Sequence, residues 1–247
     1  MASVTARLET VRARVRAAEH AAGRSPGSVT LIAVSKTKPI EAIAEAYAAG
    51  QRDFGESYAQ ELGRKADLLT RMPDIRWHFI GNVQRNKAKV VAKHAHVLHT
   101  LDSVELAREL EKRLVALGRT LETLVEVNVS GEVQKHGVSP DALAELLAVL
   151  ERTPSLVARG LMTVPPAGDD SAAERCFRAL AALAAAHPSR VCGTPTLSMG
   201  LSDDLEIAVR EGATHVRVGT AIFGPRDYAD PDGPRASCDR SGDSSDA

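Results

Sequence analysis

The sequence predicts an α/β fold, a single (β/α)8 barrel of the TIM type with an extra N-terminal helix. Eight short runs rich in β-branched residues alternate with longer segments of helical spacing over about 225 residues. Several of these runs are apolar on both faces, as buried parallel strands are. The eight strands and the lack of an early GxGxxG motif opening a helix favour the barrel over its rival, a doubly wound open sheet.

The predicted strands are short apolar runs bounded by turn residues. Because a helical segment follows each run, consecutive strands are expected to be parallel. In chain order the strands are Val29–Val34, Arg52–Gly55, Trp77–Ile80, His96–His99, Thr123–Val129, Val157–Val164, Thr196–Met199 and His215–Val218.

The predicted helices carry apolar residues three and four positions apart and have capping residues at their ends. The extra N-terminal helix covers Val4–Ala22. Ser57 with Gln60, and Asp102 with Glu105, are predicted to open two of the helices as capping pairs. Including these two, the helices after the N-terminal one are predicted at Pro39–Ala49, Ser57–Leu69, from Asp102 to Gly118, from Ser139 onward, at Ser171–His187 and at Ser202–Glu211.

Composition and charge limit the classes of function. Hydrophobic residues make up 44% of the chain and charged residues 26%, as in soluble globular proteins. The formal net charge of -1 builds no global field for nucleic acid or an acidic membrane surface. No apolar run approaches the roughly 20 residues of a membrane span, and the N-terminus lacks a signal-peptide core. The expected location is a reducing cytoplasm, because no zinc or CxxC spacing joins Cys176, Cys192 and Cys238.

We expect residues 1–224 to form the barrel domain. From Pro225 onward the chain loses its apolar periodicity and is rich in Asp, Ser, Gly and Pro, which predicts a disordered tail over residues 225–247. Cys238 lies in that tail and is expected to be an unpaired thiol.

Lys36 directly follows the first predicted strand, and TIM barrels carry their function at the C-terminal ends of the strands. At the mouth of an apolar barrel, desolvation would lower the pKa of this lysine and free its amine as a nucleophile, as Schiff-base chemistry requires. The alternative is an ordinary surface lysine, of which Lys38 is an example.

The loops after the seventh and eighth predicted strands are where such barrels often bind phosphate. Residues Ser198–Ser202 and Gly219–Gly224 supply small residues, hydroxyls and backbone N–H groups. Asp203 and Asp204 would repel a phosphate at the helix predicted to start at Ser202, so the turn at Gly219 is the better anchor. An ordinary turn is the alternative for each loop alone, whereas both together favour a phosphate ligand.

Arg217 lies inside the last predicted strand, where a charge is costly unless it is paired or bound to a ligand. It either points at a ligand in the barrel mouth or pairs with Glu126 of the fifth strand. The basic segment Gln84–Lys93 could dock RNA or an acidic partner, although a solvated helix face is the commoner meaning of such a run. His78 and His215 are interpreted as core histidines.

Seven sequence blocks are distinctive. They are AVSKTKP (Ala33–Pro39), FGESYAQE (Phe54–Glu61), WHFIGNVQRNK (Trp77–Lys87), VNVSGEVQKHG (Val127–Gly137), GLMTV (Gly160–Val164), LSMGLSDD (Leu197–Asp204) and VRVGTAIFG (Val216–Gly224). In this order the blocks resemble the pyridoxal phosphate homeostasis protein family, also called YggS/PROSC or proline synthetase co-transcribed. The resemblance implies a barrel like the N-terminal domain of alanine racemases that holds pyridoxal 5'-phosphate (PLP) without established enzymatic activity.

Position by position, the resemblance implies a role for most of the candidate residues. Lys36 resembles the Schiff-base lysine, and Arg217 the arginine facing the pyridine nitrogen. Ser57 stands where the family usually has Asn and is a candidate cofactor contact, while Val83 replaces a Leu. The phosphate cradle is implied at Ser198, Gly200, Gly219 and Thr220.

The expected function is intracellular PLP homeostasis by a monomeric carrier, with PLP-dependent apo-enzymes as candidate partners. A cationic Arg217 beside the ring nitrogen would disfavour ring protonation and weaken the electron sink that PLP catalysis needs. Two alternatives stay open. One is a weak racemase or lyase acting on small amino acids through Lys36, and the other is an interaction module working through Gln84–Lys93.

Overall fold

The computed structural model describes residues 2–132, 134–188, 191 and 193–225. The predicted tail lies outside the described residues except for Pro225, and so do Cys192 and Cys238. The predicted disorder and the unpaired state of Cys238 therefore stay predictions.

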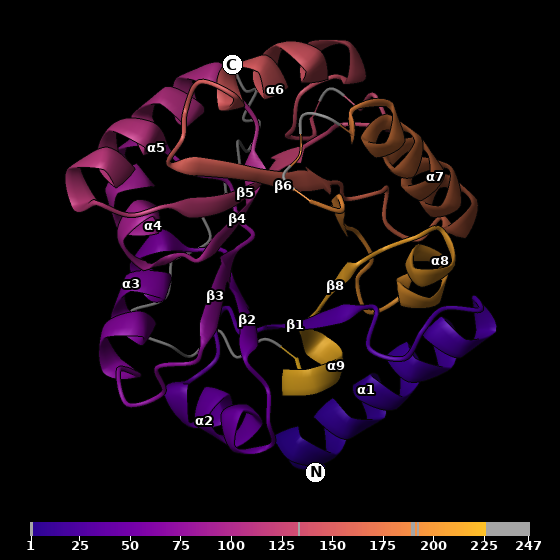
Figure 1. Ribbon diagram of the computed structural model, residues 1–247. Coiled ribbons are helices and arrows are strands. Elements are labelled where there is room, and N and C mark those ends of the chain that lie inside the picture. The colour runs from indigo at the N-terminus through magenta and orange to yellow at the C-terminus, as the bar shows by residue number, and fades with distance from the viewer. Residues whose placement is uncertain (1, 133, 189–190, 192, 226–247) are drawn as a thin grey trace, which may run out of the picture.

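Eight parallel strands form a closed barrel in chain order, with β8 pairing back onto β1 (Figure 1). This confirms the predicted fold, and each predicted strand is found within a few residues of its expected place. The strands are β1 (Thr30–Val34), β2 (Asp53–Glu56), β3 (Arg76–Phe79), β4 (Val97–Leu101), β5 (Leu121–Glu126), β6 (Leu156–Met162), β7 (Thr196–Ser198) and β8 (His215–Val218).

The helices form a ring outside the strands (Figure 1). The α-helices are α1 (Val4–Ala21), α2 (Ile40–Ala48), α3 (Ala59–Leu68), α4 (Ala88–His94), α5 (Val104–Leu117), α6 (Leu143–Leu150), α7 (Asp170–Ala186), α8 (Leu205–Arg210) and α9 (Thr220–Phe223). Two single-turn 3-10 helices, η1 (Arg85–Lys87) and η2 (Pro140–Ala142), precede α4 and α6.

Both predicted capping pairs are wrong, each by one residue. The N-cap of α3 is Tyr58, which makes no side-chain cap bond, because Ser57 still belongs to the segment leaving β2. The N-cap of α5 is Ser103, whose hydroxyl accepts a hydrogen bond from the Leu106 N–H at 3.4 Å. Asp102 instead accepts from the Ser103 hydroxyl at 3.1 Å, so Ser103 and not Asp102 caps α5.

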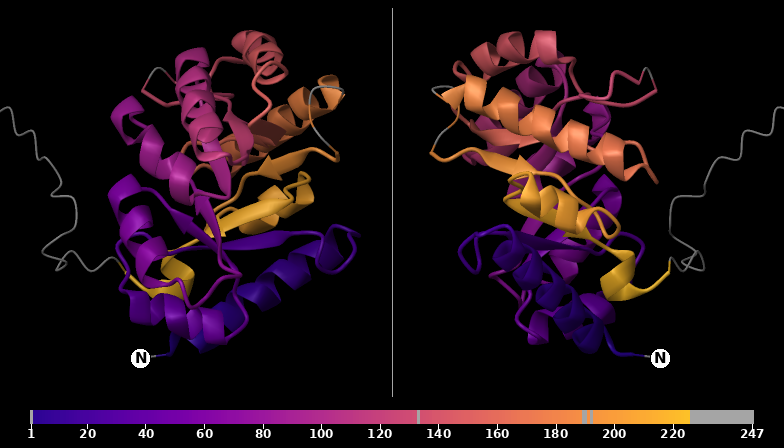
Figure 2. Two further views of the ribbon diagram at one scale, coloured as in Figure 1. Left: turned by 60° about the vertical axis from the view of Figure 1, so that its left-hand side comes forward. Right: turned by 90° about the vertical axis from the view of Figure 1, so that its right-hand side faces the viewer.

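The N-terminal helix α1 completes the outer ring. Within the described residues, β8 is followed by the four-residue α9 alone, and this helix is too short to cover the outer faces of β8 and β1. Helix α1 packs against α2, α8 and α9, and its buried side chains include Leu8, Val11 and Val15. The right-hand view of Figure 2 shows α7, α8 and α1 one below another along that side of the barrel. The helix before β1 therefore takes the place that a helix after β8 fills in an ordinary barrel.

The barrel interior is polar at its centre, in contrast to the apolar barrel expected from the sequence. Outward-facing strand residues such as Leu31 and Phe54 join a buried apolar cluster with the helices. His78 and His99, in contrast, contact each other and the His215 ring of β8. Contacts between β3, β4 and β8 require these side chains to point inward.

None of the helices within the described residues is long and apolar enough to cross a membrane.

Candidate functional site

The predicted site residues come from four strands that are neighbours in the barrel, β7, β8, β1 and β2. They lie at the C-terminal end of each strand or just beyond it, and because the strands are parallel these ends open at one mouth. An ideal Cβ on Gly219, after β8, would lie 3.3 Å from the Val34 carbonyl oxygen at the end of β1. The loop after β8 therefore lies directly against the C-terminal end of β1, two residues before Lys36.

Lys36 is half-buried at the first corner of a tight turn after β1. The Ser35 carbonyl accepts a hydrogen bond from the Lys38 N–H at 3.0 Å, which closes the turn. Thr37 adopts a left-handed backbone with φ of 61°, a conformation that β-branched residues rarely take. Its N–H donates to the Glu61 carboxylate at 2.7 Å, so α3 holds the turn in this strained form.

A buried lysine of α3, Lys65, also stabilises this turn. The Lys65 ammonium of α3 donates to the Ser35 carbonyl at 2.7 Å, to Glu56 Oε1 at 2.8 Å and to Glu61 Oε1 at 2.7 Å. These contacts use all three donors of the ammonium group. The Ser35 hydroxyl donates to the same Glu56 oxygen at 2.6 Å. Burial raises the pKa of Glu56 to about 7, against the opposing effect of the Lys65 charge.

This cluster of buried charged residues was not predicted from the sequence. A lysine and a glutamate four residues apart on one helix, Glu61 and Lys65, are a weak signal, because such pairs are usually solvated. Only the packing of α3 under the β1 and β2 ends shows that Lys65 is fully buried.

The turn after β8 leads into α9, and its amides are the predicted phosphate anchor. The hydrogen bonds of α9 begin with the Ile222 and Phe223 N–H groups, which both donate to the Gly219 carbonyl at 2.9 Å. The N–H groups of Thr220 and Ala221 therefore stand at the open end of the helix. No acidic residue lies in this first turn, and the Thr220 side chain is exposed. This end of α9 can accept an anion.

Gly200 is required by the packing of the loop after β7. Its φ is +96°, and an ideal Cβ there would lie 2.5 Å from Ala208 Cβ. Its carbonyl accepts from the Arg217 N–H at 3.0 Å, which ties this loop to β8. Two aspartates follow, and Asp204 is the N-cap of α8 and accepts from the Leu201 N–H at 2.5 Å. Packing and backbone conformation alone therefore explain why position 200 is a glycine, independently of any ligand.

Arg217 is 3% exposed, and its partners are not those weighed from the sequence. Its guanidinium donates to Ser198 Oγ at 2.5 Å and to the Thr163 carbonyl at 3.0 Å. Glu126 makes no ion pair with it, although the structure describes both residues. Burial lowers the pKa of Arg217 to about 10, so the side chain is still a cation at neutral pH.

The hydroxyl of Ser198 is engaged inside the barrel, whereas that of Ser57 is not. Ser198 is fully buried and bonds His99 Nδ1 at 2.8 Å in addition to Arg217. Its hydroxyl therefore cannot also point at a phosphate in this conformation. The half-buried hydroxyl of Ser57 makes no hydrogen bond within the described part of the chain and stays a candidate ligand contact.

A cavity of about 260 Å³ opens at this mouth between β5 and β6. Its lining includes Glu126, Lys135, His136 and Thr163, the residue whose carbonyl holds Arg217. Burial and, to a lesser degree, Asp102 raise the pKa of Glu126 to about 7, while Arg217 acts against them. The mouth thus offers a small ligand a cavity beside a buried cation.

The basic segment Gln84–Lys93 forms η1 and most of α4. Its apolar residues Ala88, Val91 and Ala92 are buried, whereas Arg85, Lys89 and Lys93 are exposed. Lys93 lies 3.7 Å from Asp67 of the neighbouring helix α3. This pattern is that of an ordinary amphipathic helix of the outer ring.

The chain is similar to known proteins over nearly its whole length. The family described as "Alanine racemase, N-terminal domain" matches residues 7–227. The pyridoxal phosphate homeostasis protein of Pseudomonas aeruginosa is 45% identical over 232 residues, which cover 94% of this chain and 99% of that protein.

Two solved structures extend the comparison. PipY of Synechococcus elongatus with PLP bound has a TM-score of 0.79 and 37% identity, covering 90% of this chain and 100% of that chain. Alanine racemase from Corynebacterium glutamicum has a TM-score of 0.62 and 19% identity, covering 90% of this chain and 62% of that chain. The second similarity is one of fold.

Proposed function

Because the chain belongs to the pyridoxal phosphate homeostasis protein family, we propose that it binds pyridoxal 5'-phosphate at the C-terminal mouth of its barrel and serves intracellular PLP homeostasis. The proposal is supported by relatives of that name over nearly the whole chain and by a similar protein solved with PLP bound. We assign the binding role to the barrel domain, residues 1–224.

The residues at the mouth fit this cofactor. PLP supplies an aldehyde that condenses with a lysine amine with loss of water, a phosphate group and a pyridine ring. Lys36 provides the amine, on a turn that Lys65 and Glu61 hold in place. The open N–H groups at the start of α9, with the Thr220 hydroxyl, provide donors for the phosphate. Contact between Gly219 and the end of β1 brings these two elements together, and this is the observation that carries the proposal.

Four further residues have proposed roles. Arg217 faces the ring as a buried cation and disfavours protonation of the ring nitrogen by like-charge repulsion. The amide of Gly200 contributes to the phosphate loop, and the Ser57 hydroxyl contacts the cofactor from the end of β2. Ser198, whose hydroxyl is engaged by Arg217 and His99, contributes backbone groups alone to that loop.

We propose that the protein is a carrier and not an enzyme. A cation opposite the ring nitrogen weakens the electron sink on which strong carbanion chemistry with PLP depends. We further propose that the carrier works as a monomer in the cytoplasm and exchanges PLP with PLP-dependent apo-enzymes. The composition and the cysteine spacing support this location.

Borohydride trapping tests the proposal. The purified protein is loaded with PLP and reduced, which converts the C=N bond to a stable secondary amine, and its peptides are sequenced by mass spectrometry. We expect the pyridoxyl group on Lys36. Lys36→Ala should lose the visible absorbance of the loaded protein, whereas the matched variant Lys38→Ala should keep it.

Two results would contradict the proposal. An adduct only on residues other than Lys36, or no PLP binding, would overturn the assigned site. Sustained racemisation or cleavage of small amino acids by the loaded wild-type protein would overturn the carrier role and establish the enzyme.

A further inference from the structure

A row of hydrogen-bonded polar side chains crosses the interior of the barrel. Asp53 Oδ1 lies 2.9 Å from His78 Nε2, and His78 Nδ1 lies 2.9 Å from His99 Nε2. His99 Nδ1 lies 2.8 Å from Ser198 Oγ, which accepts from Arg217. The five residues come from β2, β3, β4, β7 and β8. We call them the Asp53–Arg217 relay.

The relay is buried along most of its length. His78, His99 and Ser198 have no exposed surface, and Arg217 is 3% exposed. Only Asp53, at the N-terminal end of β2, is partly in contact with solvent. Polar groups are costly in such an interior unless each one is hydrogen-bonded, and every heteroatom of the two imidazoles has a partner here.

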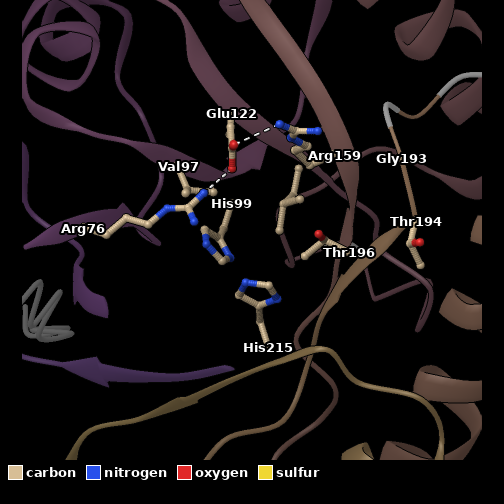
Figure 3. A pocket seen from close by; sticks show the side chains of 10 residues that line it. Arg76, Val97, His99, Glu122, Arg159, Gly193, Thr194, Thr196 and His215 are labelled. Carbon is tan, nitrogen blue, oxygen red and sulfur yellow. Dashed lines mark hydrogen bonds and ion pairs between the residues drawn. The ribbon is translucent and has the colours of Figure 1, made fainter. Parts of the chain in front are cut away.

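Figure 3 shows the N-terminal mouth of the barrel, where His99 and His215 point into a cavity of about 280 Å³. On its wall Glu122 is ion-paired with both Arg76 and Arg159. His215 lies beside the relay but does not belong to it, because its Nδ1 bonds the Thr214 hydroxyl at 3.0 Å. His215 therefore serves as the control position for His99, because it lies in the same interior but outside the relay.

The two ends of the relay determine the direction of every hydrogen bond in it. Arg217 can only donate, and an ionised Asp53 can only accept. Burial favours the neutral form of Asp53, but its hydrogen bond with His78 lowers the pKa below the ordinary value, so the group is a carboxylate at neutral pH. Burial lowers the pKa of His78 and of His99, so both rings are neutral.

One proton arrangement satisfies these conditions. His78 donates from Nε2 to Asp53 and accepts at Nδ1 from His99 Nε2–H. His99 then accepts at Nδ1 from the Ser198 hydroxyl, whose oxygen accepts from Arg217. Each member donates toward Asp53 and accepts from the side of Arg217, so the bonds polarise one another in the same sense.

We propose that His78, His99 and Ser198 are positioning residues, which hold the Arg217 guanidinium in one orientation at the cofactor site and link it to Asp53 at the opposite end of the barrel. The part of this inference that concerns the cofactor rests on the function proposed above. Ser198 and the Thr163 carbonyl fix two nitrogens of the guanidinium, and the histidines fix Ser198 in turn. The extended link to Asp53 also compensates a buried cation that has no ion pair among the described residues.

The first test needs no cofactor. Nitrogen-15 NMR of the histidine rings distinguishes the two neutral tautomers and the cation. We expect both His78 and His99 as the neutral Nε2–H tautomer from pH 6 to pH 8. Either ring in the Nδ1–H form, or protonated in this range, would overturn the relay. Ser198→Ala removes the hydroxyl that donates to His99 Nδ1. The Nδ1 resonance should therefore move toward the position of an unprotonated ring nitrogen that accepts no hydrogen bond.

The second test uses the PLP-loaded protein. His99→Leu should weaken PLP binding about tenfold, or ~1.4 kcal/mol, and shift the pH midpoint of the visible absorption change. His99→Gln should restore most of both, since its amide carries one donor and one acceptor. His215→Leu, the matched control, should stay within about twofold of wild type. Thermal melts confirm that each variant is folded.

The outcomes separate the two proposals. If wild type binds no PLP while the tautomers are as expected, the proposed function fails and the relay stands as a structural element. If His99→Leu is folded but binds PLP with unchanged affinity and spectrum, the positioning role is overturned although the cofactor site stands.

Discussion

Lys65 donates a hydrogen bond from its buried ammonium to the carbonyl of Ser35, the residue directly before Lys36, at 2.7 Å. The lysine proposed to carry the cofactor thus sits on a turn that is held by a second lysine. Glu56 and Glu61 complete the support, and each binds both Lys65 and the segment from Ser35 to Thr37.

Lys65→Met should be strongly destabilising, because it leaves Glu56 and Glu61 buried without their cation. We expect a loss of about 3–5 kcal/mol in the free energy of unfolding at pH 8. At pH 5 the loss should be smaller. The substitution removes the positive charge that opposes the effect of burial on Glu56, so the pKa of Glu56 in the folded state rises further. A carboxyl group with a raised folded-state pKa lowers the stability of the fold increasingly as the pH rises from its unfolded pKa to its folded pKa.

Urea unfolding at the two pH values measures this difference, and hydrogen exchange of the Lys38 amide reports loosening of the turn. Lys89→Met, at an exposed lysine of α4, is the control and should cost less than about 0.5 kcal/mol. A Lys65→Met cost no larger than that of the control would show that the cluster contributes no stability.

Thr220→Val should weaken binding of PLP about tenfold or more while leaving pyridoxal, which lacks the phosphate, unchanged. A hydrogen bond to a charged group is worth about 1.5–3 kcal/mol, and the α9 amides stay in place. Fluorescence titration with both ligands measures the ratio. Thr120→Val, at an exposed threonine before β5 and hence at the other mouth, should leave both affinities unchanged. Equal losses for PLP and pyridoxal would place the phosphate elsewhere.

Gly200→Ala should destabilise the fold by roughly 2–4 kcal/mol, because the new methyl meets Ala208 Cβ at 2.5 Å in a backbone with φ of +96°. Gly118→Ala, at the left-handed C-cap of α5 with open space around it, shares the strain without the clash and should cost about 1 kcal/mol. Chemical denaturation compares the two. Adding Ala208→Gly should recover part of the Gly200→Ala loss, and no recovery would mean that the clash is relieved in another way.

Glu126→Gln should stabilise the apo-protein at pH 8 and leave it nearly unchanged at pH 4.5. The folded-state pKa of Glu126 is raised from 4.5 to about 7. Between these values the unfolded chain is ionised and the folded one is not, so wild-type stability falls as the pH rises through this window.

The gain should be about 1–2 kcal/mol at pH 8, allowing for the hydrated part of the side chain. Thermal melts across the pH range measure it. Glu145→Gln, at an exposed position of α6, should show no such pH dependence. A Glu126→Gln gain that is equal at both pH values would refute the raised pKa.

The fold was predictable because its signals are local and repeated. Eight apolar runs alternating with helical patterns predict a parallel α/β fold whatever the details of their ends, and their number favours the barrel over an open sheet. The helix starts were less predictable, as Ser57 and Ser103 show. Several neighbouring residues can each stand at the start of a helix, and the path of the chain after the preceding strand decides which of them does.

The sequence by itself determined the barrel, the position of Lys36 at a strand end and the loops after β7 and β8, since each depends on residues close together in the chain. Only the tertiary structure decided the partners of the buried polar groups. Arg217 binds Ser198 and not Glu126, and Lys65 lies under the Lys36 turn. His78 and His99 bond to each other, because closing the barrel brings inward side chains of separate strands within hydrogen-bond distance. Nothing in the sequence spacing of these residues encodes that distance, which depends on barrel closure and side-chain direction.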